Sequence, residues 1–341
     1  MDWALFEQLD AMRRMQGSVL DAIGLGPAEL PYRDIHQQPG LTLRRYLGEG
    51  NETGPPVLIV PAPIKRSYIW DLAPEVSAVR RCREHGSRVY LADWRPAPPQ
   101  FGLADYAGRL ILACLDAARI ERAVLLAHSL GGLFAAIFAA LHPERVQGLA
   151  LLAAPLHFGA ETPVFNAMVA QLDAGDLPES LPGSFLSAAS ANAAPDVFAA
   201  ERLADALLST GDPARLRTHL QVERWALDEF ALPRRLVAEL ATQIVREDRF
   251  LAGTLELEGR RAAPASVTAP LLCVLDPRCR LVPPGAVTPF VEAAASRHKT
   301  VLRYEGDVGV ALQHLGPLVG RNAHALLWPQ IVTWMARTWA H

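Results

Sequence analysis

The sequence predicts an α/β chain with a mostly parallel central sheet, helices on both of its faces and an inserted helical lid. Short, fully apolar runs alternate with longer segments whose apolar residues are spaced by three and four. This pattern is typical of buried parallel strands joined by helices. The alternation stops at about residue 156 and resumes at about residue 266, and the segment between is helical and rich in Pro and Ala.

The first expected element is an amphipathic helix over residues 4–23, where apolar residues recur every three or four positions. Short β-like runs follow, including 41–47. The expected sheet elements then come in the order strand 57–60, helix 72–85, strand 88–92, helix 103–118, strand 123–127, helix 130–141, strand 146–154, strand 270–275, strand 300–304 and helix 322–338. This order divides the chain into an N-terminal helical segment (1–30), a core (31–155 and 266–341) and a lid (156–265).

Composition narrows the functional classes. The 341 residues are 50% apolar and carry a formal net charge of −3, which argues against nucleic acid or an anionic membrane as the main partner. We expect a cytoplasmic protein without a transmembrane segment, because no leader and no sufficiently long apolar stretch is found. The four cysteines lack metal-type spacing, which indicates reduced thiols and no metal site. A small substrate or a protein partner, including a second copy in a homodimer, stays open.

The chemistry is concentrated at Ser129, in the motif A-H-S-L-G-G over 127–132. Small residues two positions before and after the serine allow the strained strand-to-helix turn that lifts a nucleophile above a sheet. The helix that follows directs its first N–H groups at an oxyanion, and we expect Leu130 to be one donor. A turn that merely joins a strand to a helix is the alternative. The strand, turn and helix together predict an α/β-hydrolase fold with Ser129 as nucleophile.

From about residue 55 to the C-terminus, the chain resembles the polyhydroxyalkanoate synthase family. The matching segments are PVLIVP (56–61), YIWDLAPE (68–75), DWRP (93–96), WALDEFALP (225–233) and EDRF (247–250) with Gly253. That family passes hydroxyacyl groups from coenzyme A onto a growing polyester through a cysteine at the elbow, with a histidine and an aspartate. Here Ser129 occupies the cysteine position. Serine supports ester and thioester hydrolysis once a base activates it, so the resemblance implies acyl transfer with serine as nucleophile.

The resemblance places the general base at His314, between strand 300–304 and the closing helix. This position also fits the chain order of nucleophile, acid and histidine in such folds. A helix-capping or surface histidine is the alternative. His128, next to the nucleophile in sequence, points elsewhere in such a turn, and we expect it to pack against or orient other groups.

The acid is less well defined by the sequence. In the register of the family, Cys279 stands where the aspartate belongs. Asp276 is the best candidate, although three extended residues span up to about 10 Å and the loop would have to rearrange to bring its carboxylate to His314. Glu161 and Asp307 are weaker candidates. A loop aspartate beside a proline is often a turn former, which is the alternative role for Asp276.

The second oxyanion donor must come from the loop after residue 60. Pro61 and Pro63 have no N–H, so Ala62 or Ile64 must supply it, and we expect Ile64. Lys65 and Arg66 beside this loop would suit the phosphates of coenzyme A, although a solvated basic pair is the simpler interpretation. Coenzyme A enters here as part of a substrate thioester, and no cofactor is expected.

These features predict a serine-dependent acyl hydrolase or acyltransferase that acts on hydroxyacyl thioesters or polyhydroxyalkanoate-type esters through an acyl-enzyme. One alternative is a polyhydroxyalkanoate synthase proper, which would release coenzyme A and retain the polymer. The other is a non-catalytic relative that binds polyester granules or a partner protein, motivated by Cys279 in the acid position and the prolines in the oxyanion loop.

Overall fold

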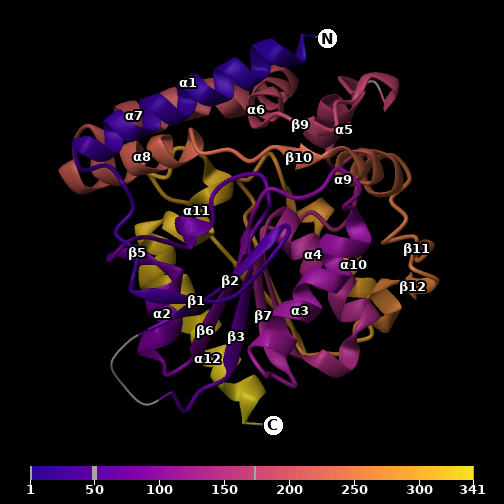
Figure 1. Ribbon diagram of the computed structural model, residues 1–341. Helices are drawn as coiled ribbons and strands as arrows, with labels where there is room; N and C mark the ends of the chain where they lie inside the picture. Colours follow the sequence, from indigo (N-terminus) through magenta and orange to yellow (C-terminus); the bar gives the residue numbers. More distant parts are fainter. Residues whose placement is uncertain (1, 48–51, 173, 341) are drawn as a thin grey trace.

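The computed structural model describes residues 2–47, 52–172 and 174–340. The predicted N-terminal segment begins at residue 1 and the predicted core ends at residue 341, and both of these residues lie outside the described part. Its centre is an eight-stranded sheet in the order β1-β2-β6-β3-β7-β8-β13-β14 (Figure 1). The strands are β1 (Tyr32–Gln38), β2 (Leu41–Tyr46), β3 (Pro56–Val60), β6 (Arg88–Trp94), β7 (Ala123–His128), β8 (Val146–Leu152), β13 (Leu271–Leu275) and β14 (Lys299–Arg303). The six strands β6, β3, β7, β8, β13 and β14 pair in parallel. At the other edge, β2 pairs antiparallel with β6, and β1 pairs antiparallel with β2.

Helices cover both faces of the sheet because the central strands are apolar on both sides. Leu58 and Val60 of β3 belong to one core, and Val57 and Ile59 belong to the other, since successive side chains of a strand point to opposite faces. The first core is closed by α3 (Leu110–Ala117), α4 (Leu130–Leu141) and α10 (Thr288–Ala293), and the second by α2 (Ala78–Glu84), α11 (Gly316–Val319) and α12 (Trp328–Trp339). The predicted mostly parallel sheet with helices on both faces is confirmed.

The expected helix over 72–85 is much shorter in the structure. Its first part is a hairpin of β4 (Asp71–Ala73) and β5 (Val76–Ser77), and α2 follows. Pro74 in the connecting turn has no N–H to donate to a helix. Ser77 instead caps α2, because its hydroxyl accepts a hydrogen bond from the Arg80 N–H at 2.9 Å.

Between β8 and β13 the chain crosses the carboxyl ends of the strands and forms the lid (Figure 1). The lid helices are α5 (Pro163–Ala170), α6 (Gly183–Ala193), α7 (Glu201–Ser209), α8 (Pro213–Ala226) and α9 (Arg234–Glu239). Two short strand pairs were not expected from the sequence: β9 (Ser180–Leu181) with β10 (Leu232–Pro233), and β11 (Leu255–Leu257) with β12 (Arg260–Ala262). Strands of two or three residues are too short for an alternating pattern to identify them.

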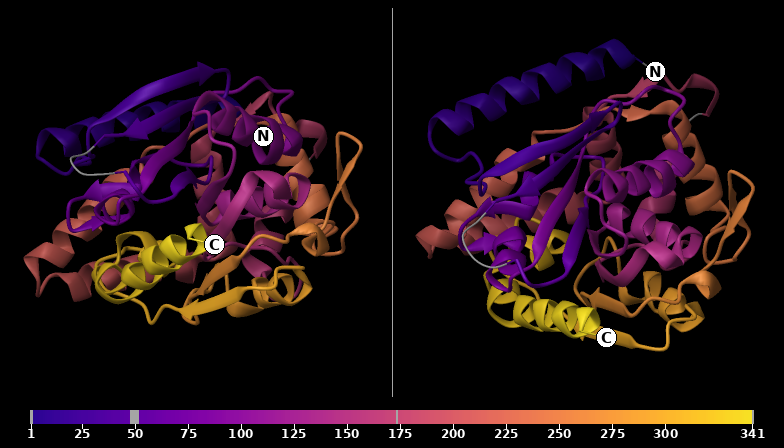
Figure 2. Two further views of the ribbon diagram at one scale, coloured as in Figure 1. Left: turned by 90° about the horizontal axis from the view of Figure 1, so that it is seen from below. Right: turned by 60° about the horizontal axis from the view of Figure 1, so that its bottom comes forward.

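The N-terminal helix α1 (Trp3–Ala22) belongs to the same layer as the lid. It runs along the outer side of the lid, at the opposite end of the molecule from the C-terminus (Figure 2). The Asp10 carboxylate accepts the N–H groups of Gly183 and Ser184, the first residues of α6. Arg224 of α8 donates to both carboxylate oxygens of Asp21. Capping and ion pairing therefore attach α1 to two lid helices.

Helix α4 approaches the end of β3 more closely than a side chain allows. A Cβ atom at Gly131 would lie 2.1 Å from the Val60 carbonyl oxygen and 2.6 Å from the Pro61 carbonyl carbon. Both contacts are with backbone, which cannot move aside as a flexible side chain would. The sequence therefore needs glycine at this position for the helix to begin where it does.

We expect Gly131→Ala to lower the free energy of unfolding by about 3 kcal/mol, at the upper end of the usual overpacking cost, because the turn must shift away from β3. Urea denaturation followed by circular dichroism measures this change. Gly108→Ala is the matched control: no atom lies within 4 Å of a Cβ there, and the position is helical, so the variant should be as stable as the wild type or slightly more stable. Equal stability of all three proteins would contradict the close approach.

Candidate active site

Ser129 lies at the carboxyl end of β7, where the chain turns sharply into α4. Its backbone has φ 56° and ψ −133°, a conformation that costs a non-glycine residue about 1–3 kcal/mol. Hydrogen bonds on both sides hold the turn: the Ser129 N–H donates to the Leu152 carbonyl of β8 at 3.1 Å, and the Gly132 N–H donates to the Ser129 carbonyl at 2.8 Å. The turn lifts the Ser129 hydroxyl above the sheet, as the sequence predicted.

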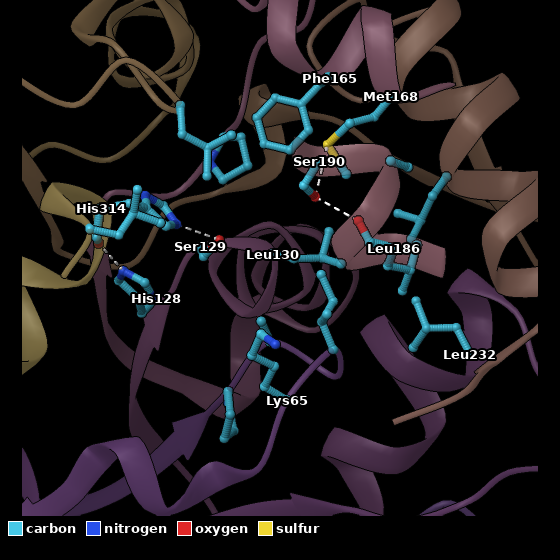
Figure 3. Close-up of a pocket in the computed structure, with 18 of the residues that line it drawn as sticks. Lys65, His128, Ser129, Leu130, Phe165, Met168, Leu186, Ser190, Leu232 and His314 are labelled. Atoms are coloured by element: carbon cyan, nitrogen blue, oxygen red, sulfur yellow. Dashed lines mark hydrogen bonds between the residues drawn. The ribbon is translucent and has the colours of Figure 1, made fainter. Parts of the chain in front are cut away.

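The imidazole of His314 meets this hydroxyl. The two come from distant parts of the chain, since His314 lies in the short helical turn Gln313–Leu315 between β14 and α11. Its Nε2 is 2.8 Å from Ser129 Oγ (Figure 3). The structure therefore brings together the two side chains that the sequence selected, within proton-transfer distance of each other.

The other nitrogen of His314 faces a thiol. Nδ1 lies 3.5 Å from Cys279 Sγ, which also accepts the Val282 N–H at 3.3 Å. Burial raises the pKa of the Cys279 thiol to about 12, so the group is neutral near pH 7. A neutral thiol can donate to Nδ1 or accept from it, whereas a carboxylate can only accept. Cys279 therefore does not select one tautomer of His314.

The structure does not bring Asp276 to His314, and this expectation is corrected. Asp276 Oδ1 accepts the Arg278 N–H at 2.8 Å, as a turn-forming aspartate does. Within the described part of the chain, its buried Oδ2 has no hydrogen-bond partner, and burial raises the pKa of this carboxyl. The other two acid candidates also lie elsewhere: Asp307 accepts from the Tyr304 hydroxyl, and Glu161 packs beside Gly285. The side chain beside His314 Nδ1 is therefore Cys279.

His128 supports the backbone of His314 from below. The His128 Nε2–H donates to the His314 carbonyl at 2.8 Å, and the two rings lie 4.6 Å apart (Figure 3). Burial lowers the pKa of His128 to about 4. Burial, with the nearby His128 as a smaller cause, holds the pKa of His314 well below its usual value. Both imidazoles are therefore neutral near pH 7, and His314 can accept a proton.

An apolar cavity of about 270 Å³ opens above Ser129 and His314. Lid residues line the cavity opposite them, among them Phe165, Met168, Leu186 and Leu232 (Figure 3), together with Val237 and Ile244. Ser190, a polar residue of this lining, is already bonded, because its hydroxyl donates to the Leu186 carbonyl at 2.7 Å. The cavity therefore matches an apolar acyl chain better than a charged one.

The residues expected to supply the two oxyanion donors, Leu130 and Ile64, both line the cavity above Ser129. Leu130 begins α4, and its N–H has no acceptor within the helix because no turn of the helix precedes it. Ile64 lines the cavity, and its carbonyl accepts the Phe230 N–H of the lid at 2.9 Å. The same loop is anchored to the core by Trp94, whose Nε1–H donates to the Pro61 carbonyl at 2.7 Å. The loop is thus held between the core and the lid.

The suggestion that Lys65 binds coenzyme A phosphates is corrected. Its Nζ donates to Glu229 Oε1 at 2.8 Å and to the Ala226 carbonyl, and burial lowers the pKa of its ammonium group. Glu229 also pairs with Arg13 of α1. Nothing in the sequence linked Lys65 to Glu229, which lies 164 positions away. The Arg66 guanidinium lies 4.3 Å above the Phe230 ring.

The described residues contain neither a cluster of metal-ligating side chains nor a helix that could cross a membrane. No group of three or more His, Cys, Asp or Glu side chains among them is arranged to hold a metal ion. None of the helices in residues 2–47, 52–172 and 174–340 is both long and apolar enough to cross a bilayer.

Comparison with known proteins bears on the fold of the chain and on its relatives. The family described as "alpha/beta hydrolase fold" matches residues 55–197. The chain is 26% identical over 345 residues to the poly(3-hydroxyalkanoate) polymerase subunit PhaC of Allochromatium vinosum, covering 96% of each. It is 28% identical to the same subunit of Haloferax mediterranei, covering 92% of this chain and 65% of that one.

Among solved structures, a monoacylglycerol lipase from Paleococcus ferrophilus superposes with a TM-score of 0.55 at 17% identity, covering 87% of this chain and 99% of that one. At this identity the match bears on the fold alone, and it confirms the predicted α/β-hydrolase fold together with the eight-stranded sheet. The matches to the polymerase subunits extend over most of the chain at 25–28% identity. The chain therefore has the α/β-hydrolase fold and is similar over most of its length to the polyhydroxyalkanoate polymerase subunit PhaC.

Proposed function

We propose that this chain is a serine-dependent acyl hydrolase or acyltransferase that acts on hydroxyacyl thioesters or polyhydroxyalkanoate-type esters through an acyl-enzyme. The fold and the PhaC homologues make it an enzyme of the esterase or acyltransferase type. The observation that carries the finer proposal is the 2.8 Å contact between Ser129 Oγ and His314 Nε2 at the base of an apolar cavity.

In the proposed reaction, neutral His314 takes the proton from the Ser129 hydroxyl as Oγ attacks the acyl carbon. The N–H groups of Leu130 and Ile64 stabilise the oxyanion of the tetrahedral intermediate. The His314 imidazolium then gives its proton to the departing thiol or alcohol, leaving an acyl group on Oγ. A water molecule or an acceptor alcohol then attacks the acyl carbon and gives its proton to His314. The bond from the acyl carbon to Ser129 Oγ breaks, and Oγ takes the proton back from His314.

The neutral thiol beside His314 Nδ1 makes this a slow version of the reaction. A carboxylate at that position normally selects the productive tautomer and stabilises the imidazolium, and its loss costs about 10⁴-fold in rate. Cys279 offers no negative charge, and either partner can supply the shared proton. We therefore expect the imidazolium that forms during the reaction to be only weakly stabilised by the protein.

The second candidate function is polyester synthesis, in which the acceptor is the hydroxyl end of a growing chain rather than water. It is favoured by the near full-length similarity to polymerase subunits. The two functions share every step up to the acyl-enzyme and differ in the acceptor alone. Incubation with a hydroxybutyryl coenzyme A thioester separates them, because hydrolysis releases free hydroxy acid whereas synthesis releases coenzyme A and keeps the acyl groups in polymer.

Ser129→Ala should abolish covalent labelling by a fluorophosphonate, because that probe reacts with an activated serine. Hydrolysis of the hydroxybutyryl thioester should fall by about 10²-fold, less than in an intact triad, because the site already lacks the carboxylate and losses within a catalytic unit are not additive. Ser18→Ala, an exposed position on α1, should keep both properties. A folded wild-type protein that is not labelled, or that performs no better than Ser129→Ala in every acyl assay, would favour the non-catalytic alternative.

Cys279→Asp should raise kcat/KM at pH 8 by at least about tenfold, which is a small part of the 10⁴-fold value of a triad carboxylate. The carboxylate would accept the Nδ1–H and favour the tautomer that leaves Nε2 free to act as base. Cys279→Asn is a neutral control of the same size, and it should show no gain. Equal rates for the two variants would mean that the thiol position does not act through His314.

The pH profile tests the protonation state of His314. Only the neutral imidazole can act as base, and burial holds the pKa of His314 well below 6.5. The kcat/KM of the wild type should therefore stay constant as the pH falls from 8 through 6.5, and decline only at lower pH. In Cys279→Asp the decline should begin at higher pH, because a neighbouring carboxylate favours the imidazolium. Half-maximal wild-type activity at pH 7 or above would contradict the neutral site.

A further inference from the structure

A buried carboxylate of the lid holds the loop that carries His314. Asp205 lies on α7 and is 7% exposed. Its Oδ1 accepts the Gly309 N–H and its Oδ2 accepts the Ala311 N–H, both at 2.8 Å. Gly309 and Ala311 belong to the connection between β14 and the turn that contains His314. One side chain of the lid therefore bonds two backbone groups on the core side of the cavity.

The Asp205 carboxylate is itself held in place by a second lid helix. The Nδ1–H of His219, on α8, donates to Asp205 Oδ2 at 2.7 Å, and the His219 side chain is 5% exposed. Burial acts to raise the pKa of Asp205, but the hydrogen bonds from His219, Gly309 and Ala311 outweigh it and keep that pKa below its usual value. The carboxylate is thus ionised, and its bonds to the loop are of the stronger, charge-assisted kind.

The loop needs this support because its backbone is unfavourable. Gly309 has φ 91°, and Ala311 has φ 59°, in the left-handed region that a residue with a Cβ rarely adopts. Such conformations persist only where the surroundings hold them. No strand or helix includes residues 304–312. The bonds from Asp205 therefore supply part of the support that regular secondary structure would otherwise give this segment.

The same stretch of the lid also contacts the loop on the other side of His314. Arg280, the residue after Cys279, pairs with Asp196 just before α7 and lies 3.5 Å from Glu201 within it. These groups are more exposed than Asp205, so their contribution is small. Their position nevertheless means that α7 and the residues before it lie against both loops that meet at the imidazole.

We propose that Asp205, held by His219, is a positioning residue for His314: the lid carboxylate fixes the loop that presents the imidazole to Ser129. This inference rests on the proposed role of His314 as the base. It implies that the base is in place only while α7 and α8 are docked on the core. Movement of these lid helices away from the sheet would release the loop at the same time, so the nucleophile is activated only beneath a closed lid.

Asp205→Asn tests the inference, because the amide has nearly the same shape but lacks the charge and presents an NH₂ group to one of the three donors. We expect kcat for hydroxybutyryl thioester hydrolysis and the rate of fluorophosphonate labelling to fall at least about tenfold, since a misplacement of about 1 Å in a catalytic group can cost 10²-fold. KM should stay within about twofold, because Asp205 is not among the residues that line the cavity.

Two variants of His219 separate positioning from a general loss of stability. His219→Asn keeps an N–H donor near the position of Nδ1 and should retain most of the wild-type kcat. His219→Phe removes the donor and should lower kcat by less than Asp205→Asn, since the carboxylate still binds the loop. Leu115→Ala, in the core of α3, should lower the melting temperature and leave the kcat of the folded protein unchanged.

The outcomes distinguish failure of this inference from failure of the proposed function. If the wild type hydrolyses the thioester and is labelled, but Asp205→Asn and His219→Phe have wild-type kcat and labelling rates, the positioning role is wrong. It is equally wrong if kcat follows the melting temperature alone across all four variants. If the folded wild type is neither active nor labelled, the proposed function fails first.

Discussion

The site depends on the meeting of two loops at the carboxyl edge of the parallel sheet. Ser129 is held there by the strained turn between β7 and α4, which Gly131 allows by letting the helix begin against the end of β3. His314 reaches the same point from the loop after β14, three strands away in the sheet order. Because parallel strands end at one edge, residues 185 positions apart in the chain can meet within 2.8 Å.

The resting site is nearly free of charge. The histidines beside Ser129 are buried and have lowered pKa values, and the Cys279 thiol has a raised one, so all three groups are neutral near pH 7. Neutral groups cost little to bury beneath an apolar lid, whereas an isolated carboxylate would be costly there. In the proposed reaction this becomes a disadvantage, because the imidazolium and the oxyanion would form without a fixed counter-charge beside Nδ1. Burying the uncharged resting groups therefore costs little free energy, but the charged transition state is only weakly stabilised.

Much of the fold and part of the site could be predicted from the sequence. The apolar runs identified the six parallel strands and the helix after Ser129, because burial leaves a strong apolar pattern, whereas the edge strand β1 was not singled out. The helix expected over 72–85 was partly wrong, since Pro74 and Ser77 redirect its first half into a hairpin. The family register identified Cys279 as the residue in the acid position, whereas Asp276 was selected by residue type and lies turned into its own loop.

The sequence by itself determined which local conformations are possible: apolar strands, a small-residue elbow at Ser129 and a histidine in the loop before the last helices. Only the tertiary structure decided which distant groups meet, since charges in the lid and core pair without any local pattern. The Lys65 ammonium group forms an ion pair with Glu229, and the Asp205 carboxylate binds two N–H groups of the loop that precedes His314. The physical reason is that backbone preferences act over a few residues, whereas hydrogen bonds and ion pairs between buried groups depend on how separate elements pack.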